Sequence, residues 1–242
     1  TDAATLLSVV RDPQQLPDMD DLRIAATGYA GLGFARTPHA VAEQTGLLTR
    51  HGTARLARYG FELARTRPRR LLASATKSNA LNHSMVLWDE VVAEVAKDYP
   101  DVTWQKYHVD ALAARMITHP ASLDVMIASN LFGDILTDIG AAISGSLGVA
   151  PGGNLNPDRT APSMFEPIHG SAPDIAGKGI ANPIAAIWAG ALMLRFLGER
   201  DAHDAILAAV ERVVGDGRVR TPDLGGTATT GDVLNAVLTA LG

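Results

Sequence analysis

Two aspartates, Asp134 and Asp138, lie four residues apart, shortly after the apolar run Leu123–Ala128. The run predicts a buried strand, and the residues after it predict a helix that opens near Gly133, so that both carboxylates share one helix face. α/β proteins bind ligands at the carboxyl ends of parallel strands, which is where these residues fall. Two like charges side by side repel unless a cation lies between them, and an all-oxygen site suits Mg²⁺ or Mn²⁺. The alternative interpretation is a solvated helix start, where the helix dipole favours acidic residues.

A second candidate is the segment from Phe165 to Gly177, whose small residues would let the backbone approach a ligand closely. His169 could stack on an aromatic base or hydrogen-bond to it, and Asp174 could accept hydrogen bonds from ribose hydroxyl groups. A well-packed surface loop is the alternative. The segment is not the usual glycine-rich dinucleotide fingerprint, and the superficially similar stretch 28–33 opens no helix and is discarded as a phosphate loop.

Lys77 lies just beyond the end of a predicted strand, and Asp110 directly follows another. A lysine at the end of a buried strand can have its pKa lowered and act as a base near neutral pH. Asp110 is a further carboxylate leaving a strand. Ordinary surface roles are the alternative for both residues.

Strands and helices alternate along the middle of the chain, which predicts an α/β fold with a parallel sheet and crossover helices. The predicted strands are Leu71–Ala75, Val102–Val109 and Leu123–Ala128. The predicted helices are one that begins at Thr53, carries Leu56, Tyr59 and Leu63 as its apolar stripe and ends at Pro68; Met85–Lys97, built on Val86, Val91, Val92 and Val95; and Asp110–Thr118.

The flanking regions have a different character. The first 40 residues read as an irregular loop and arm, with a short strand near Leu22–Ala26. Gly145–Gly179 is rich in glycine and proline and reads as one long functional loop. Asn182 then caps a helix that Gly198 closes, a second helix runs over Asp201–Val214, and a last one begins after Thr230.

Composition narrows the class of protein. Of the 242 residues, 47% are hydrophobic and 19% charged, which is typical of a folded globular protein. The net charge of −5 argues against nucleic acid or an acidic membrane surface as the main partner. The absence of cysteine removes thiolate chemistry and fits a cytoplasmic protein. The longest apolar helix candidate, Pro183–Leu194, is shorter than the roughly 20 residues that span a bilayer, so no membrane partner is expected.

Taken together and in this order, these segments resemble the signature blocks of the β-decarboxylating dehydrogenases of the isopropylmalate, isocitrate and tartrate type. The likeness is greatest to the tartrate dehydrogenase/decarboxylase type. It extends from about Asp20 to the C-terminus and rests on the blocks Ala75–Asn79, Ser129–Asp138 and Glu166–Pro183, with Phe61–Arg65 and Thr221–Gly226 in support. The resemblance implies a dimerisation and substrate–metal domain over residues 1–145. Residues 146–242 would be the C-terminal half of a cofactor-binding domain.

Enzymes of this kind oxidise a 2-hydroxy acid with NAD and then lose the β-carboxylate as CO₂, with a divalent metal stabilising the enolate. The resemblance implies that Asp134 and Asp138 are metal ligands and that Asp110 is the third, supplied by the other subunit of a homodimer. Lys77, also acting across the dimer interface, would help to deprotonate the substrate hydroxyl group.

The resemblance also assigns substrate and cofactor residues. Tyr29 would protonate the enolate carbon, and Arg23 would bind a substrate carboxylate. Asp174 would repel a 2′-phosphate, so that NAD is expected rather than NADP. The implied adenosine pocket consists of His169, Gly170, Ser171, Ala172, Asp174 and Asn182.

Two departures from the family pattern bear on function. The segment Arg23–Tyr29 is one residue shorter than in tartrate-type relatives and lacks their two inner acids. The family's front part is missing, and with it the first strands of the cofactor domain, the substrate loop beside the nicotinamide and two more carboxylate-binding arginines.

Two hypotheses follow. In the first, the chain is a metal-dependent NAD dehydrogenase/decarboxylase acting on a 2-hydroxy diacid, with the missing portion supplied by a separate polypeptide or by a rearranged dimer. In the second, it is a family scaffold without hydride transfer, serving as a non-redox catalyst on an activated acid or as a binding or regulatory protein.

Overall fold

The computed structural model describes residues 46–242. The helices and strands described below all belong to one compact unit, Arg50–Gly242. The expected strand near Leu22–Ala26 lies outside the described residues. The division into two domains at residue 145 stays a prediction.

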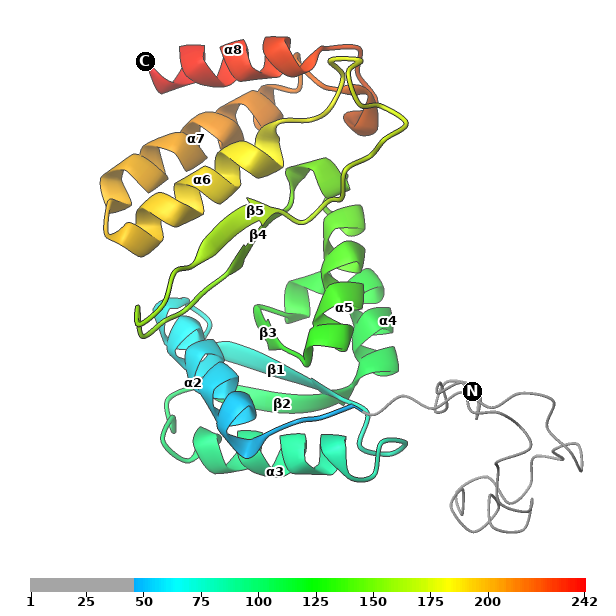
Figure 1. The fold of residues 1–242 in the computed structure, drawn as a ribbon, viewed down its shortest axis with the longest axis vertical. Helices are drawn as coiled ribbons and strands as arrows, with labels where there is room; N and C mark the ends of the chain where they lie inside the picture. The colour runs from blue at the N-terminus through cyan, green and yellow to red at the C-terminus, as the bar shows by residue number, and fades with distance from the viewer. Residues whose placement is uncertain (1–45) are drawn as a thin grey trace, which may run out of the picture. The chain divides into compact units, whose positions relative to one another are not determined.

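A three-stranded parallel sheet in the order β2-β1-β3 forms the first layer of the fold (Figure 1). β1 (Leu71–Thr76) pairs with β2 (Thr103–His108) on one side and with β3 (Val125–Ile127) on the other. α3 (Ser84–Ala96) connects β1 to β2, and α4 (Val109–Thr118) connects β2 to β3. This alternation confirms the predicted α/β fold and brings the carboxyl ends of the three strands to one edge of the sheet.

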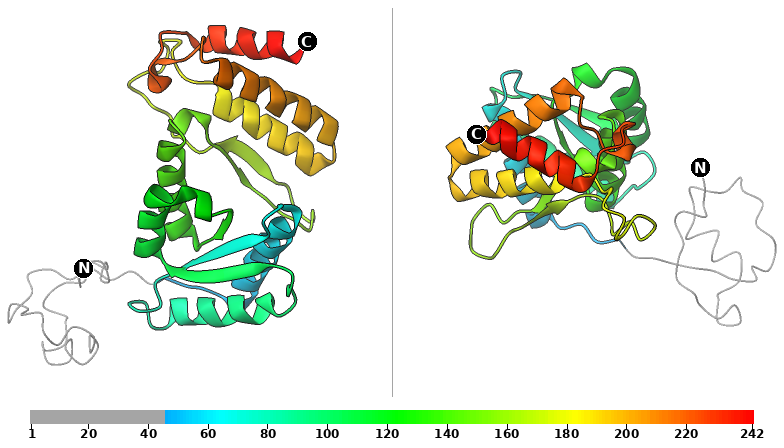
Figure 2. Two further views of the ribbon diagram at one scale, coloured as in Figure 1. Left: turned by 180° about the vertical axis from the view of Figure 1, so that it is seen from behind. Right: turned by 90° about the horizontal axis from the view of Figure 1, so that it is seen from above.

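β1 is buried on both faces because helices cover each of them. On one face the indole nitrogen of Trp88 in α3 donates a hydrogen bond of 3.0 Å to Ser74 Oγ. Val86, which the sequence placed in the core of this helix, is instead 37% exposed. On the other face Ala73 and Ala75 belong to a cluster with residues of α4 and α5, namely Leu112, Met116 and Leu136. Figures 1 and 2 show α3 on one side of the sheet and α4 and α5 on the other.

α2 (Arg50–Thr66) confirms the predicted helix but buries a different face from the one expected. The residues that it buries are Thr53, Ala57, Gly60, Phe61 and Ala64. Because most of them are small, the helix backbone can approach the sheet: a Cβ added at Gly60 would lie 2.3 Å from Ile127 Cγ2. The large apolar residues that define the predicted stripe are each 37–39% exposed, namely Leu56, Tyr59 and Leu63.

The long segment Gly145–Gly179 is not a single loop. It contains a short 3-10 turn, Leu147–Val149, and an antiparallel pair of strands, β4 (Pro151–Asn154) and β5 (Met164–Pro167). β4 was not predicted because proline and glycine have a low propensity for strands. Its strand conformation depends instead on pairing with β5 and on packing. The pair packs on α6 (Ile184–Leu197), with the rings of Phe165 and Phe196 5.7 Å apart.

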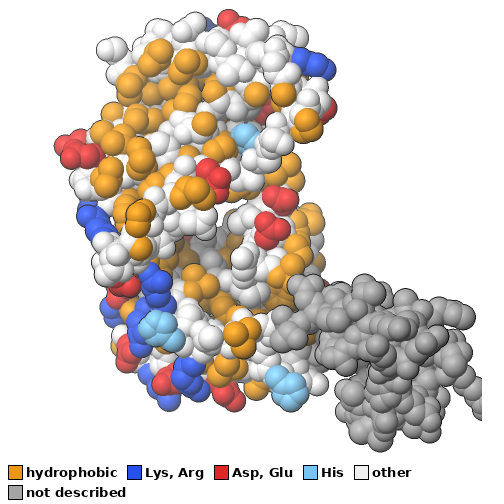
Figure 3. Space-filling model, in the orientation of Figure 1, with side chains coloured by type: hydrophobic (Ala, Val, Ile, Leu, Met, Phe, Trp, Pro, Cys, Tyr) orange, Lys and Arg blue, Asp and Glu red, His pale blue; other side chains and the backbone are white. Residues whose placement is uncertain are grey.

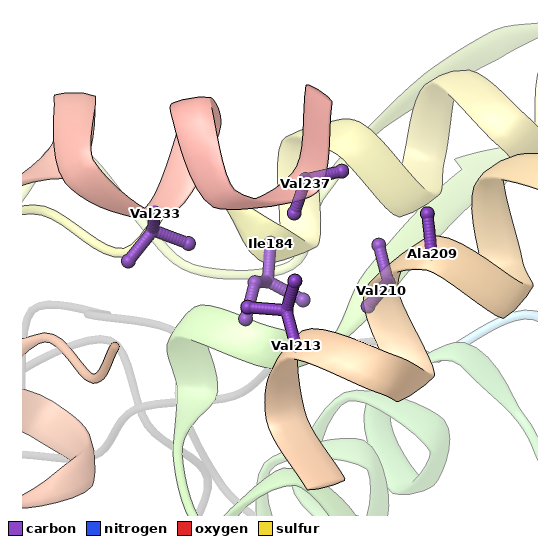
Figure 4. Packing of buried hydrophobic residues seen from close by; sticks show 6 residues of the cluster. All are labelled: Ile184, Ala209, Val210, Val213, Val233 and Val237. Atoms are coloured by element: carbon purple, nitrogen blue, oxygen red, sulfur yellow. The ribbon is translucent and has the colours of Figure 1, made fainter. Parts of the chain in front are cut away.

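Three helices at the C-terminal end pack side by side. α6 ends at Gly198 as predicted, with φ of 107°, a conformation that favours glycine. α7 (Arg200–Asp216) and α8 (Thr230–Leu241) follow. Their shared core, drawn in Figure 4, consists of Ile184, Ala209, Val210, Val213, Val233 and Val237.

Caps define the starts of two of these helices. α6 is assigned from Ile184, but Pro183 before it already has helical φ and ψ of −87° and −5°, and Asn182 Oδ1 accepts a hydrogen bond of 3.0 Å from the Ile184 amide, which is the bond predicted for a capping Asn182. α8 begins with a capping box, in which Thr229 and Asp232 each accept a hydrogen bond from the other's backbone amide.

Several apolar side chains stay at the surface. Figure 3 shows hydrophobic side chains gathered over α6 and α7, where Met193, Leu197 and Val214 are among the exposed ones. Within residues 46–242, no helix combines the length and the apolar character needed to cross a bilayer.

Alanine substitution at two helix glycines should have opposite effects on stability. Gly60→Ala should destabilise the fold by about 1–3 kcal/mol, because the new methyl group overlaps Ile127 in a packed core. Gly190→Ala in α6 meets nothing within 4 Å and should stabilise the helix by up to about 1 kcal/mol. The midpoints of urea unfolding report both changes. A stabilised Gly60→Ala variant would show that α2 does not approach the sheet as closely as described.

Candidate functional site

Lys77 and Asp110 meet at the carboxyl edge of the sheet. Thr76 at the end of β1 is opposite His108 at the end of β2, so the residues that follow these strands are neighbours. Lys77 Nζ lies 2.9 Å from Asp110 Oδ1 and donates a hydrogen bond to it. That bond, assisted by the Asp110 backbone amide, holds the pKa of the Asp110 carboxyl below its usual range. The structure thus pairs two residues that the resemblance assigned jointly to the other subunit's site.

Asp134 and Asp138 both lie on α5 (Asn130–Ile143), which directly follows β3. The helix begins at Asn130, earlier than the start expected near Gly133, but the two carboxylates share a face as predicted. Both residues are exposed, and within residues 46–242 neither carboxylate has an ion pair or a side-chain hydrogen bond. Two adjacent carboxylates without cationic partners form a donor set of hard oxygens that fits Mg²⁺ or Mn²⁺.

Within residues 46–242, no third metal ligand joins Asp134 and Asp138. Among the described residues, no three His, Asp or Glu side chains come together in a way that could hold a metal ion. The carboxylate of Asp110 is engaged by Lys77 instead. The described part of one chain therefore presents two separate pieces of the predicted metal site.

The predicted adenosine segment forms a series of tight turns after β5. His169 Nδ1 lies 3.0 Å from the Gly170 carbonyl oxygen, to which it can donate a hydrogen bond. The Ile175 amide donates to Ala172 O at 3.0 Å, and the Lys178 amide donates to Ile175 O at 3.1 Å. Asp174 is exposed and, among the described residues, has no side-chain partner, so it is open to a ligand.

Asn182 has a different environment from the rest of this segment. It is only 8% exposed, and its amide nitrogen donates a hydrogen bond of 3.0 Å to Asp223 Oδ2. Since its amide oxygen is also used, by the Ile184 amide, its side chain serves the fold. These two bonds leave one amide hydrogen and one oxygen lone pair of Asn182 unused, but its burial restricts the access of a ligand to them.

Two further predicted residues, Arg23 and Tyr29, lie outside the described residues. Conversely, sequence reasoning gave no role to Asp223 or Ser146, which join Asn182 in one hydrogen-bonded network. The sequence signal that could have found Asp223 is a single acidic residue between Pro222 and the pair Gly225-Gly226. A carboxylate in such a turn needs hydrogen-bond donors.

A parallel α/β sheet whose carboxyl edge carries a lysine–aspartate pair and the two aspartates of α5, followed by a turn-rich segment, agrees with the architecture that the resemblance to the β-decarboxylating dehydrogenases implied. The isocitrate/isopropylmalate dehydrogenase family matches residues 25–237, and the chain belongs to this family.

Individual relatives are similar over most of the chain. D-malate dehydrogenase [decarboxylating] of Escherichia coli (strain K12) is 56% identical over 206 residues, which are 83% of this chain and 57% of that protein. Tartrate dehydrogenase/decarboxylase of Pseudomonas putida is 51% identical over 217 residues, which are 87% of this chain and 59% of that protein. Among solved structures, isocitrate dehydrogenase from Methylococcus capsulatus has a TM-score of 0.79 at 40% identity, covering 88% of this chain and 63% of that chain. The chain thus spans less than two thirds of the length of these relatives.

Removing the lysine of the Lys77–Asp110 pair should raise the pKa of Asp110. In Lys77→Gln the ammonium group that stabilises the charged carboxylate is gone, so the pKa returns toward its usual range. The pair stabilises the fold only where Asp110 is ionised, so its contribution is present at neutral pH and disappears as the pH falls through the lowered pKa. NMR titration of the aspartate carboxyl carbons measures the shift. Lys106→Gln, which breaks the pair with Asp89, should leave Asp110 unchanged.

Proposed function

We propose that the protein takes part in the metal-dependent, NAD-linked oxidation and decarboxylation of a 2-hydroxy diacid similar to malate or tartrate. The observation that carries this proposal is the pair of unpartnered carboxylates, Asp134 and Asp138, on α5 at the carboxyl edge of the sheet. The names of the relatives, a D-malate and a tartrate dehydrogenase/decarboxylase, support the class of substrate.

The metal would be held by Asp134 and Asp138 of one subunit together with Asp110 of a second. When bound, a divalent cation supplies Lewis-acid polarisation of the substrate oxygens. Lys77, which lies against Asp110, would reach the same site from the second subunit and, as the neutral amine, accept the proton of the substrate hydroxyl group. Arg23 and Tyr29 would complete the substrate site as a carboxylate-binding residue and a proton donor.

Exposed apolar residues support a homodimer built on α4 and α5. Leu131 and Ile135 are 66% and 50% exposed and lie next to the two carboxylates on α5, and Ile117 of α4 is 64% exposed. Contiguous apolar patches at a surface commonly mark a protein interface, and we propose that these side chains form part of one. Covering them with a second copy of the same face would bring that copy's Lys77 and Asp110 toward Asp134 and Asp138 in an isologous arrangement.

NAD is proposed as the cofactor, with its adenosine half bound by the segment from His169 to Asn182. Asp174 is free to accept hydrogen bonds from a ribose and would repel a 2′-phosphate, which favours NAD over NADP. The nicotinamide half would depend on the portion of the relatives that this chain does not span, supplied by a separate polypeptide or by another part of the same protein.

A subunit-mixing experiment tests the shared metal site. Asp134→Asn and Asp110→Asn should each abolish Mn²⁺ or Mg²⁺ binding, because each removes a ligand from every site. Mixing the two variants should restore roughly a quarter of the sites, since half of the dimers are hybrids and one of the two sites in each hybrid is intact. Isothermal titration calorimetry measures the number of sites, and Asp201→Asn on α7 serves as a control that should bind normally.

Three results would contradict the shared metal site. No restoration on mixing would place all ligands in one chain, and no calorimetric signal from the wild type, with or without a 2-hydroxy diacid, would exclude the metal site. Sedimentation should show a dimer, and a stable monomer at micromolar concentration would contradict the shared site.

Nucleotide binding distinguishes a dehydrogenase from a family scaffold that has lost hydride transfer. With only the adenosine half of the pocket, the chain should bind NAD no more tightly than about millimolar, and ADP-ribose should bind almost as well. Asp174→Ala should weaken both, as measured by NMR titration. Adding a polypeptide that supplies the remaining portion should restore a preference for NAD, together with metal-dependent NAD reduction by a 2-hydroxy diacid. If no adenine nucleotide bound, the scaffold function would be favoured.

A further inference from the structure

Asp223 lies at the centre of a hydrogen-bonded network that no proposed catalytic or binding role uses. It belongs to a 3-10 turn, Pro222–Leu224, between α7 and α8. Its Oδ2 accepts hydrogen bonds from Ser146 Oγ and from Asn182 Nδ2. One carboxylate oxygen therefore joins three segments that are distant in sequence: the turn after α5, the segment before α6 and the turn before α8.

The donors are themselves fixed. Ser146 is 9% exposed and its hydroxyl oxygen accepts a hydrogen bond of 2.9 Å from the Gly148 amide. Asn182 is equally buried and holds the Ile184 amide through its other side-chain atom. Desolvation alone would raise the pKa of Asp223, but the hydrogen bonds to its carboxylate, those from Ser146 and Asn182 among them, outweigh it and the pKa lies below its usual range. Asp223 is thus a charged acceptor, which makes the bonds that it accepts stronger than bonds between neutral groups.

A second anchor holds the same segment from the side of α8. The Thr230 amide donates to Gly179 O at 2.8 Å, and Thr230 Oγ1 donates to Ala181 O at 2.6 Å. The main chain from Gly179 to Asn182 is therefore held at one end by Thr230 and at the other by Asp223. The intervening peptide groups keep a defined position while Asp174, earlier in the same segment, stays open.

Glycine at position 148 shows how closely the network is packed. A Cβ added there would lie 2.8 Å from Asn182 Cβ and 2.9 Å from Asp223 Oδ2. Contacts this short cannot persist, so a methyl group would push Asn182 and Asp223 apart without removing either hydrogen-bonding group.

We propose that Asp223 is a positioning residue for nucleotide binding: its carboxylate fixes Asn182, and through it the main chain of Gly179–Asn182, in the conformation that receives the adenosine half of the cofactor. The inference rests on the nucleotide site proposed above. Pre-organising this main chain reduces the ordering cost that a ligand would otherwise meet on binding.

Amide exchange measured residue by residue by NMR tests the anchor directly. The Ile184 amide is bonded to Asn182 Oδ1, so its exchange should accelerate about tenfold or more in Asp223→Ala and in Gly148→Ala, if release of Asn182 removes one hydrogen bond to a charged group. The Asp232 amide, which is bonded to Thr229 Oγ1 in the capping box, should be unaffected. Gly190→Ala is the matched control for the glycine substitution, because a methyl group there meets nothing within 4 Å.

Affinity for ADP-ribose tests the consequence for function. Asp223→Ala and Gly148→Ala should each weaken binding about tenfold, whereas Asp223→Asn, which keeps an oxygen acceptor for both donors, should stay within about threefold of the wild type. Metal binding at Asp134 and Asp138 should not change in any of these variants, which separates positioning from a general loss of structure.

Each outcome decides a different part of the inference. Unchanged exchange at Ile184 in both variants would overturn the anchor. Faster exchange with unchanged ADP-ribose affinity would overturn its role in nucleotide binding. A wild-type chain that binds no ADP-ribose, with exchange at Ile184 still dependent on Asp223, would overturn the nucleotide site itself and with it the functional part of the inference, while the anchor would stand.

Discussion

Burial of β1 on both faces is the constraint on which the rest of the site depends. A strand that contacts helices on each side has to present apolar or hydrogen-bonded side chains to both of them, and residues 72–75 of β1 satisfy that need. Ser74 is acceptable in this position because the Trp88 indole donates to it. With β1 fixed between β2 and β3, the chain has to leave all three strands at the same edge. Lys77, Asp110 and the start of α5 follow from that topology.

The charges at this edge of the sheet are unevenly balanced: one carboxylate is paired with a lysine, and two are not paired with any cation of the described residues. Lys77 and Asp110 neutralise each other, whereas the described structure provides no cation for Asp134 and Asp138. Keeping two like charges four residues apart on one helix costs stability unless a ligand or partner compensates. The exposed apolar residues on the same helix agree with the second subunit proposed above as a source of this compensation.

Hydrophobic periodicity and the ends of strands were sufficient to predict most of the fold. Particular residues show where the prediction from sequence was wrong. The helix over Arg50–Thr66 was predictable, but its orientation was not, since Leu56, Tyr59 and Leu63 look like a core stripe. The face that is buried owes its place to small side chains and to contact with Ile127, which is distant in sequence. β4 could not be recognised either, because its residues are glycine, proline and asparagine and only the partner strand defines it.

The candidate site, like the fold, could be predicted from the sequence only in part. The spacing of Asp134 and Asp138 and the strand-end positions of Lys77 and Asp110 are local features, so the sequence was sufficient to find them. The link between Asp223 and Asn182 spans 41 residues and exists only after the C-terminal helices have packed. The resemblance assigned Asn182 to the adenosine pocket, and the structure adds to its capping bond with the Ile184 amide a hydrogen bond from its side chain to Asp223, which no local pattern predicts.

The capping box of α8 has a consequence beyond the start of that helix. Thr229 and Asp232 fix the first turn. Thr230, the first residue of the helix, donates hydrogen bonds from its amide and its hydroxyl group to the carbonyl oxygens of Gly179 and Ala181. Fraying of a helix end is normally a local event with a small free-energy cost. Here, unwinding the first turn of α8 would also release a peptide segment some fifty residues away. Thermal motion at the beginning of the last helix is thereby coupled to the order of the loop before α6, and the two should open and close as one cooperative unit.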